Sequence, residues 1–94
     1  MEELNDKVAV ITGAGGGFGR EFARRAAREG MRLVLADVQR EALDAIVDEL
    51  RESGVSVIGE VVDVAVSRQV AHLADRAFAE FGGVPIATEV LQYR

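Results

Sequence analysis

One segment decides the fold of this chain: Lys7-Val8-Ala9-Val10-Ile11-Thr12-Gly13-Ala14-Gly15-Gly16-Gly17-Phe18-Gly19-Arg20. It opens with small and β-branched apolar residues, which are typical of a strand buried on both faces of a parallel sheet. Five of the seven residues from Gly13 to Gly19 are glycines, and helix-forming residues follow. Glycine lets the backbone approach a ligand closely, because it has no Cβ. The N–H groups and dipole of a helix N-terminus attract anions, so this segment predicts a nucleotide phosphate site.

The spacing of the glycines excludes two common phosphate-binding patterns. A P-loop ends in Gly-Lys-Ser/Thr, whereas an Arg-Glu pair follows the last glycine here. The strict G-x-G-x-x-G pattern also fails, because its last position falls on Phe18 or Arg20, depending on the starting glycine. Two looser patterns fit: the G-x-G-x-G of methyl-donor-binding domains, over residues 13–17, and T-G-x-x-x-G-x-G, over residues 12–19.

Composition limits the classes of protein that the chain can represent. Its 94 residues suit one small domain, and the absence of cysteine excludes disulfides and thiolate metal sites. We predict no metal site. Acidic residues outnumber basic ones by 16 to 11, so we expect no nucleic-acid partner. The N-terminus lacks the pattern of a signal peptide and no apolar run is long enough to span a membrane, so we expect a soluble, cytoplasmic chain without a membrane partner.

Hydrophobic periodicity beyond the glycine loop predicts alternating helices and strands. The predicted elements are a helix over 19–29, a strand over 32–37, a helix over 39–52, a strand over 55–62, a helix over 67–81 and a fourth strand that begins at residue 84. This order predicts an α/β fold of the Rossmann type, in three α/β/α layers, with a parallel sheet in the strand order 3-2-1-4. We expect residues 1–94 to form a single partial domain, about one βαβαβα(β) half of such a fold, with a divergent tail over 85–94.

Two acids are predicted to lie at the edge of the sheet that holds the loop. Asp37 ends the second strand, 18 residues past Gly19, where a dinucleotide fold places the acid that accepts hydrogen bonds from the adenosine ribose. A carboxylate there repels a 2′-phosphate, which favours NAD over NADP. Asp63 ends the third strand at the same edge. A loop-capping role for Asp37, and a helix-capping role for Asp63, are the alternatives.

With Thr12-Gly13-x-x-x-Gly17-x-Gly19, the sequence resembles the short-chain dehydrogenases/reductases from about residue 5 to residue 84. In that family an Asp-Val pair borders the adenine ring, which the resemblance assigns to Asp63 and Val64. Members that prefer NADP carry a basic residue at the positions of Gly16 or Val38, and neither is basic here. The implied cofactor-binding residues are Thr12, Gly13, Gly15, Gly16, Gly17, Phe18, Gly19, Asp37, Val38, Asp63 and Val64.

The resemblance ends before the family's catalytic residues. Its Asn-Asn-Ala-Gly sequence falls on residues 89–92, which do not match, and its serine and Tyr-x-x-x-Lys pair lie further along. The only tyrosine is Tyr93, and the only lysine, Lys7, precedes the first strand, so no catalytic set can be assembled.

Three interpretations stay open. The chain is the shortened N-terminal part of an NAD(P)-dependent oxidoreductase that transfers hydride between NAD and an alcohol or ketone, and is inactive alone. Alternatively, it is a self-standing, non-catalytic nucleotide-binding module, or the cofactor half of an S-adenosylmethionine-dependent methyltransferase.

The end of the chain also affects the predicted sheet. Pro85 has no N–H to donate to a ladder of hydrogen bonds, so we expect no proper fourth strand beside the first. The first strand would then present an apolar edge. This predicts marginal stability or self-association through that edge.

Overall fold

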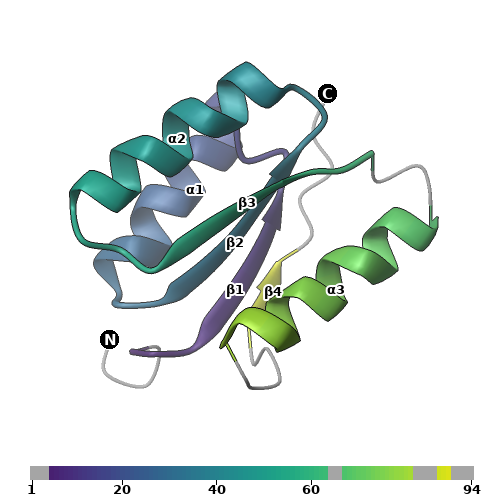
Figure 1. Ribbon diagram of the computed structural model, residues 1–94. Helices are drawn as coiled ribbons and strands as arrows, with labels where there is room; N and C mark the ends of the chain where they lie inside the picture. Colours follow the sequence, from purple (N-terminus) through teal and green to yellow (C-terminus); the bar gives the residue numbers. More distant parts are fainter. Residues whose placement is uncertain (1–4, 64–66, 82–86, 90–94) are drawn as a thin grey trace.

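The computed structural model describes residues 5–63, 67–81 and 87–89, and in them helices and strands alternate (Figure 1). The elements are β1 (Val8–Thr12), α1 (Gly17–Arg28), β2 (Arg32–Asp37), α2 (Arg40–Glu52), β3 (Val57–Val61), α3 (Ser67–Phe81) and β4 (Ala87–Glu89). None of the described helices is long and apolar enough to cross a membrane.

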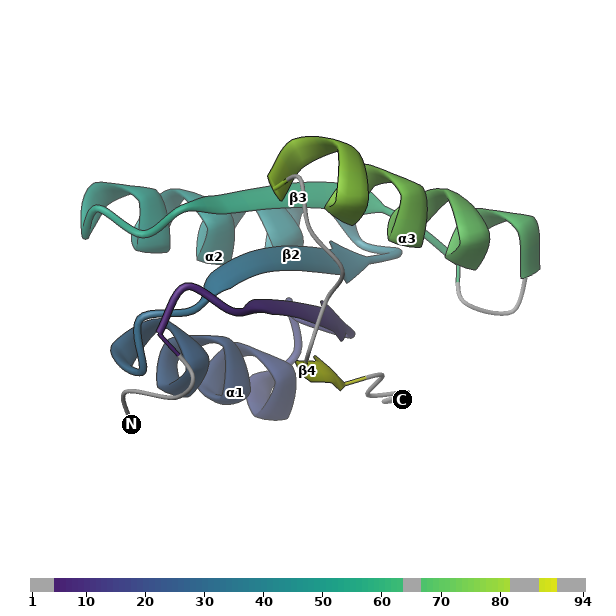
Figure 2. The same cartoon turned by 90° about the horizontal axis from the view of Figure 1, so that it is seen from below.

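The strands form one parallel sheet in the order β3-β2-β1-β4. Helices α1 and α2 lie together on one side of it and α3 lies on the other, as the two perpendicular views show (Figures 1 and 2). In the register of the sheet, Val10 lies between Val34 of β2 and Thr88 of β4. The predicted Rossmann-type fold and strand order are therefore confirmed.

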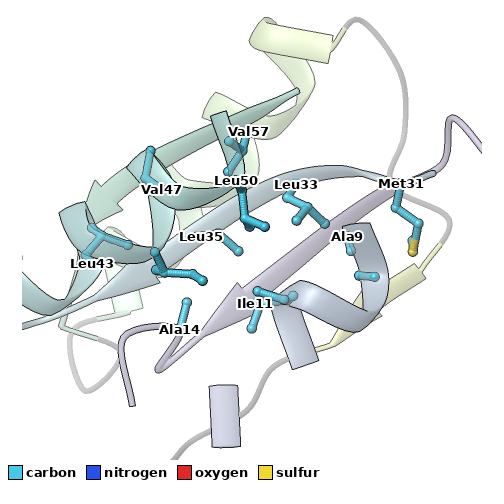
Figure 3. Packing of buried hydrophobic residues seen from close by; sticks show 13 residues of the cluster. Ala9, Ile11, Ala14, Met31, Leu33, Leu35, Leu43, Val47, Leu50 and Val57 are labelled. Atoms are coloured by element: carbon cyan, nitrogen blue, oxygen red, sulfur yellow. The ribbon is translucent and has the colours of Figure 1, made fainter. Parts of the chain in front are cut away.

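The alternation of side chains along the strands divides the core into two layers. Between the sheet and helices α1 and α2 lie strand residues such as Ala9, Ile11 and Leu33 (Figure 3). On the α3 side lie their sequence neighbours, among them Val10 and Val34, with Leu73 of α3. Because successive residues point to opposite faces, a strand covered on both sides is expected to be largely apolar, as β1 is from Val8 to Ile11.

One helix and one strand begin two residues away from the predicted position. Helix α1 begins two residues earlier, because the Arg20 N–H donates to the Gly16 carbonyl at 2.8 Å and draws the last glycines into the helix. Strand β3 begins at Val57 rather than Val55, whose N–H instead donates to the Leu50 carbonyl at the end of α2.

A glycine within β3 is explained by the packing of α2. A Cβ at Gly59 would lie 2.9 Å from Cγ2 of Val47, so this helix packs against bare backbone. Glycine within a strand often marks such a close approach.

The prediction that β1 lies at an edge of the sheet is wrong. Ala87–Glu89 form β4, which pairs in parallel with β1 opposite Ala9, Val10 and Ile11. Pro85 precedes this strand in the sequence, so its missing N–H does not interrupt the ladder. Pro85 itself lies outside the described residues, and self-association of the chain stays an untested prediction.

Candidate functional site

Three of the predicted site residues mark the carboxyl ends of adjacent strands. Thr12 is the last residue of β1 and Asp37 the last of β2, while Asp63 follows β3 by two residues. Carboxyl ends of parallel strands share one edge of the sheet, and ligands of open α/β sheets bind at that edge. Thr12 is buried, whereas Asp37 is half-buried and Asp63 is exposed.

The loop between β1 and α1 is a tight turn anchored to β2. Gly13 has a φ of 69°, in the left-handed region that glycine adopts without strain. Its carbonyl accepts the N–H of Gly16 at 3.1 Å, which closes the turn. The next N–H, that of Ala14, donates to the Ala36 carbonyl at 3.0 Å. These bonds fix the point at which the chain enters α1.

The glycines of the loop serve two different purposes. A Cβ at Gly19 would collide with the Gly13 carbonyl oxygen, and one at Gly15 would lie 2.7 Å from Cβ of Ala42 in α2. These two glycines allow α1 and α2 to pack against the loop. A Cβ at Gly17, in contrast, would meet no atom within 4 Å in the described part of the chain. Packing against the described residues therefore does not require glycine at this position.

The N-terminus of α1 faces this open side without a cap. Its N-cap residue, Gly16, has no side chain to accept the N–H groups of the first turn, and no acidic residue lies in that turn. The first-turn N–H groups of an α-helix have no acceptor within the helix. Together with the helix dipole they favour an anion such as a phosphate.

The Asp37 carboxylate is held by two backbone N–H groups. Its Oδ2 accepts from Gly15 at 2.9 Å and its Oδ1 accepts from Gln39 at 3.0 Å. The acid therefore caps the loop, which is the alternative raised from the sequence. A carboxylate has about four acceptor positions, so two remain for the hydroxyls of a ligand. Loop capping and ligand binding are thus compatible.

The remaining predicted residues lie around this arrangement. Phe18, at the start of α1, and Val38, just after Asp37, are large apolar side chains that are 57% and 56% exposed. The Asp63 N–H donates to Oε1 of Gln69 at 2.8 Å, while Val64 lies outside the described residues. This contact of Gln69 was not predicted from the sequence, although a glutamine in the first turn of a helix often accepts a hydrogen bond from the backbone that precedes the helix.

Arg20 is a second residue that the sequence analysis did not assign to the site. Its Nη2 donates to the Gly15 carbonyl at 2.9 Å, from the first turn of α1. Its Nε is buried and has no hydrogen-bond partner within the described residues. The guanidinium of Arg20, a partly exposed residue, therefore lies against the loop.

Polar groups at the opposite edge of the sheet are engaged in structural bonds. Arg32, the first residue of β2, donates to the Asp6 carbonyl at 2.8 and 3.0 Å and to the Phe81 carbonyl at 3.3 Å. Its guanidinium also lies 5.3 Å from the centre of the Phe81 ring. Lys7 precedes β1 at this edge, far from the loop, and Tyr93 lies outside the described residues.

An ion pair joins the two helices beside the site. Arg24 of α1 contacts Glu49 of α2 at 2.6 and 2.8 Å and also contacts Glu21 at 2.6 Å. Through its hydrogen bond, the Arg24 guanidinium lowers the pKa of the Glu49 carboxyl below its usual value. The same contact raises the pKa of Arg24.

This fold and loop define a Rossmann-type domain with a glycine-rich turn after its first strand. Comparison with known proteins identifies the family: the short chain dehydrogenase family matches residues 7–88. The chain therefore belongs to the short-chain dehydrogenases and corresponds to their N-terminal segment. The match ends four residues beyond the limit of 84 predicted from the sequence.

Relatives and solved structures agree on this family. An uncharacterized oxidoreductase, YxnA, from Bacillus subtilis is 40% identical over 87% of this chain and 23% of its own length. A short chain dehydrogenase/reductase from Burkholderia phymatum, in complex with NAD, superposes with a TM-score of 0.85 at 56% identity, over 89% of this chain and 30% of that one. A 3-ketoacyl-(acyl-carrier-protein) reductase from Brucella melitensis, complexed with NADH, superposes with a TM-score of 0.77 at 32% identity. This match covers 86% of this chain and 32% of the reductase. The chain thus spans about a quarter to a third of their length.

Proposed function

We propose that this chain is the dinucleotide-binding segment of an NAD(P)-dependent short-chain oxidoreductase and that it prefers NAD. The complete enzyme would transfer hydride between the nicotinamide and an alcohol or ketone. The solved Burkholderia and Brucella neighbours, which contain NAD and NADH, support a dinucleotide cofactor. The observation that carries the proposal is the uncapped N-terminus of α1, open at Gly17, beside Asp37.

The residues of the loop fit the pyrophosphate of such a cofactor. The first turn of α1 offers N–H groups and a positive dipole end, with no acid to repel a phosphate. A side chain at Gly17 would occupy the open space in which the pyrophosphate would lie. Glycine at this position is therefore best explained by a ligand.

The proposed preference for NAD rests on Asp37. Its carboxylate is fixed by the Gly15 and Gln39 N–H groups, so it cannot easily turn away from a ligand. A ribose with free hydroxyls can donate to it, whereas the 2′-phosphate of NADP would bring like charges together. Neither Gly16 nor Val38 offers a basic side chain to compensate.

The bound nicotinamide would supply the hydride chemistry, and this chain's residues would hold the adenosine and pyrophosphate. Oxidation of an alcohol also requires a group that takes the substrate proton. We expect the chain alone to show no nicotinamide-dependent turnover with alcohols, ketones or sugars. Turnover that survives Tyr93→Phe would show that another residue moves the proton, and would contradict this expectation.

Thermal unfolding with different nucleotides tests the proposal directly. A ligand in hundredfold excess over its Kd stabilises the folded state by about 2.7 kcal/mol. Millimolar NAD should therefore raise the Tm by several degrees if the Kd is on the order of tens of micromolar. NADP should raise it less. An increase in Tm with S-adenosylmethionine but not with NAD or NADP would favour the methyltransferase interpretation. An unchanged Tm with every nucleotide would contradict the proposed function.

An Asp37→Ala variant tests the basis of the preference. Removal of the carboxylate should narrow the difference between the increases in Tm that NAD and NADP produce. Asp44→Ala, on the exposed surface of α2, removes the same charge away from the loop and is the matched control. Equal increases in Tm with NAD and NADP in the unmodified chain would show that Asp37 does not discriminate against the 2′-phosphate of NADP.

A further inference from the structure

Both backbone polar groups of Gly15 are held by charged side chains. The N–H donates to Oδ2 of Asp37, 22 residues away, at 2.9 Å, and the carbonyl accepts from Nη2 of Arg20 at 2.9 Å. Gly15 is itself buried, and a Cβ there would also lie 3.1 Å from Oδ2 of Asp37. The glycine therefore sits between an acid at the end of β2 and a base on α1.

Arg20 forms no salt bridge within the described residues, although the hydrogen bond from Arg24 and, more weakly, the nearby charge of Arg20 lower the pKa of the Glu49 carboxyl. The Nε of Arg20 is buried without a partner in the described part of the chain, and a buried unpaired donor costs free energy. The other arginines of α1, at positions 24, 25 and 28, are neighbours that could carry surface charge without such a cost. What Arg20 gains in return is its bond to the loop carbonyl.

That bond orders a part of the chain that would otherwise be mobile. A segment with five glycines in seven residues has high conformational freedom, and a ligand that binds must remove this freedom. With its N–H and its carbonyl both held, Gly15 fixes the peptide planes on either side. The Gly15 carbonyl is then directed to Arg20, and the following residues enter α1 with their N–H groups at the open side.

We propose that Arg20 is a positioning residue: it holds the Gly15 carbonyl so that the loop is ordered for a pyrophosphate before the cofactor binds. This inference rests on the proposed function and adds to it. Arg20 acts through the backbone of Gly15 and does not itself touch the cofactor. Loss of Arg20 should weaken NAD binding. It should also change the backbone environment of Gly15 in the absence of a ligand.

The test compares Arg20→Met with Arg25→Met, which removes the same charge from an exposed position on the same helix. By calorimetric titration with NAD, we expect Arg20→Met to raise the Kd about tenfold, the effect of one lost charge-assisted hydrogen bond. Arg25→Met should leave the Kd within about twofold. Arg20→Lys keeps a donor in reach of the carbonyl and should restore most of the affinity.

A second measurement needs no ligand. In 1H–15N spectra of the free chain, the Gly15 amide signal should shift, and exchange with solvent faster, in Arg20→Met but not in Arg25→Met. If Arg20→Met fails to fold, Arg20→Gln, whose side chain is too short to keep the bond in place, takes its position with the same expected loss.

The possible failures are distinguishable. If NAD does not bind the unmodified chain, the proposed function is wrong and this inference falls with it. If NAD binds the unmodified chain and Arg20→Met equally, only the inference is wrong. Equal weakening by Arg20→Met and Arg25→Met would indicate general charge attraction, and would also overturn it.

Discussion

The two edges of the sheet use their polar groups in opposite ways. At the amino edge, Arg32 joins the start of β2 to the Asp6 and Phe81 carbonyls and lies against the Phe81 ring. At the carboxyl edge, α1 begins without a cap and its first turn faces open space at Gly17. Arg32 closes one edge with bonds within the chain, and the other is the edge at which we propose that the dinucleotide binds.

Because of this difference, we expect stability and ligand binding to depend on opposite edges of the sheet. Substitutions at the amino edge should change the free energy of unfolding and leave nucleotide affinity unaltered. Substitutions at the carboxyl edge should do the reverse, except where a residue packs α1 against the loop. The predictions below test this separation.

Gly19→Ala should have the largest effect, because it affects both properties at once. Its Cβ would collide with the Gly13 carbonyl oxygen, so α1 must move away from the loop. We expect a loss of about 3 kcal/mol in the free energy of unfolding and no measurable NAD binding. Urea unfolding with and without NAD measures both. An unchanged midpoint would show that the helix can shift without penalty.

Gly17→Val should separate the two properties. The new side chain enters open space and therefore should alter the free energy of unfolding by less than about 1 kcal/mol. It should abolish the Tm shifts that NAD and NADP produce, because it fills the space proposed for the pyrophosphate. A variant that keeps the full NAD shift would place the ligand elsewhere.

Arg32→Met should give the converse result. It removes the bonds to the Asp6 and Phe81 carbonyls but retains an apolar stem. We expect a loss of about 1–2 kcal/mol in unfolding free energy. The Kd for NAD, titrated well below the Tm, should not change. A weaker NAD affinity would mean that the two edges are coupled through β2.

Glu49→Gln should have the smallest effect and a distinctive pH dependence. The bond to Arg24 lowers the folded-state pKa of Glu49, so its contribution is present above the unfolded-state pKa and is lost as the pH falls through the folded-state value. The difference in stability between the unmodified chain and Glu49→Gln should thus be visible at pH 7 and vanish in acid. It should be small, because both side chains are partly exposed. A difference that grows in acid would contradict this assignment.

Much of the fold could be predicted because β1 and β2 are apolar on both faces. The structure confirms β2 and α3 at their predicted bounds. The start of α1 was predicted two residues late, since glycine has low helix propensity and the bond from Arg20 to Gly16 outweighs it. The strand order placed a fourth strand beside β1, but Pro85 led us to expect no proper strand there, and β4 forms over only three residues, Ala87–Glu89, which give no periodicity to recognise.

The site was predictable only in part. Asp37 could be placed because an acid at the end of the second strand has a fixed position in this fold. Loop capping by Asp37 was raised as an alternative, but the sequence could not predict that Asp37 accepts from the Gly15 N–H or that Arg20 donates to the Gly15 carbonyl, since both bonds depend on the curvature of the loop. Sequence patterns identify which residues reach an edge, but not which backbone groups they satisfy there.

The central place of β1 has a consequence for the way the chain is made. It precedes the other three described strands in the sequence, yet its two partners are β2 and β4, and Ala9 pairs with Ala87. Such distant pairing closes a long loop and folds slowly. On the ribosome, β1 can pair with β2 early but must wait for two further helices and a strand before β4 arrives. The strand that leads into the glycine loop is therefore the first of these four strands to emerge, and its pairing is complete only when β4 has followed.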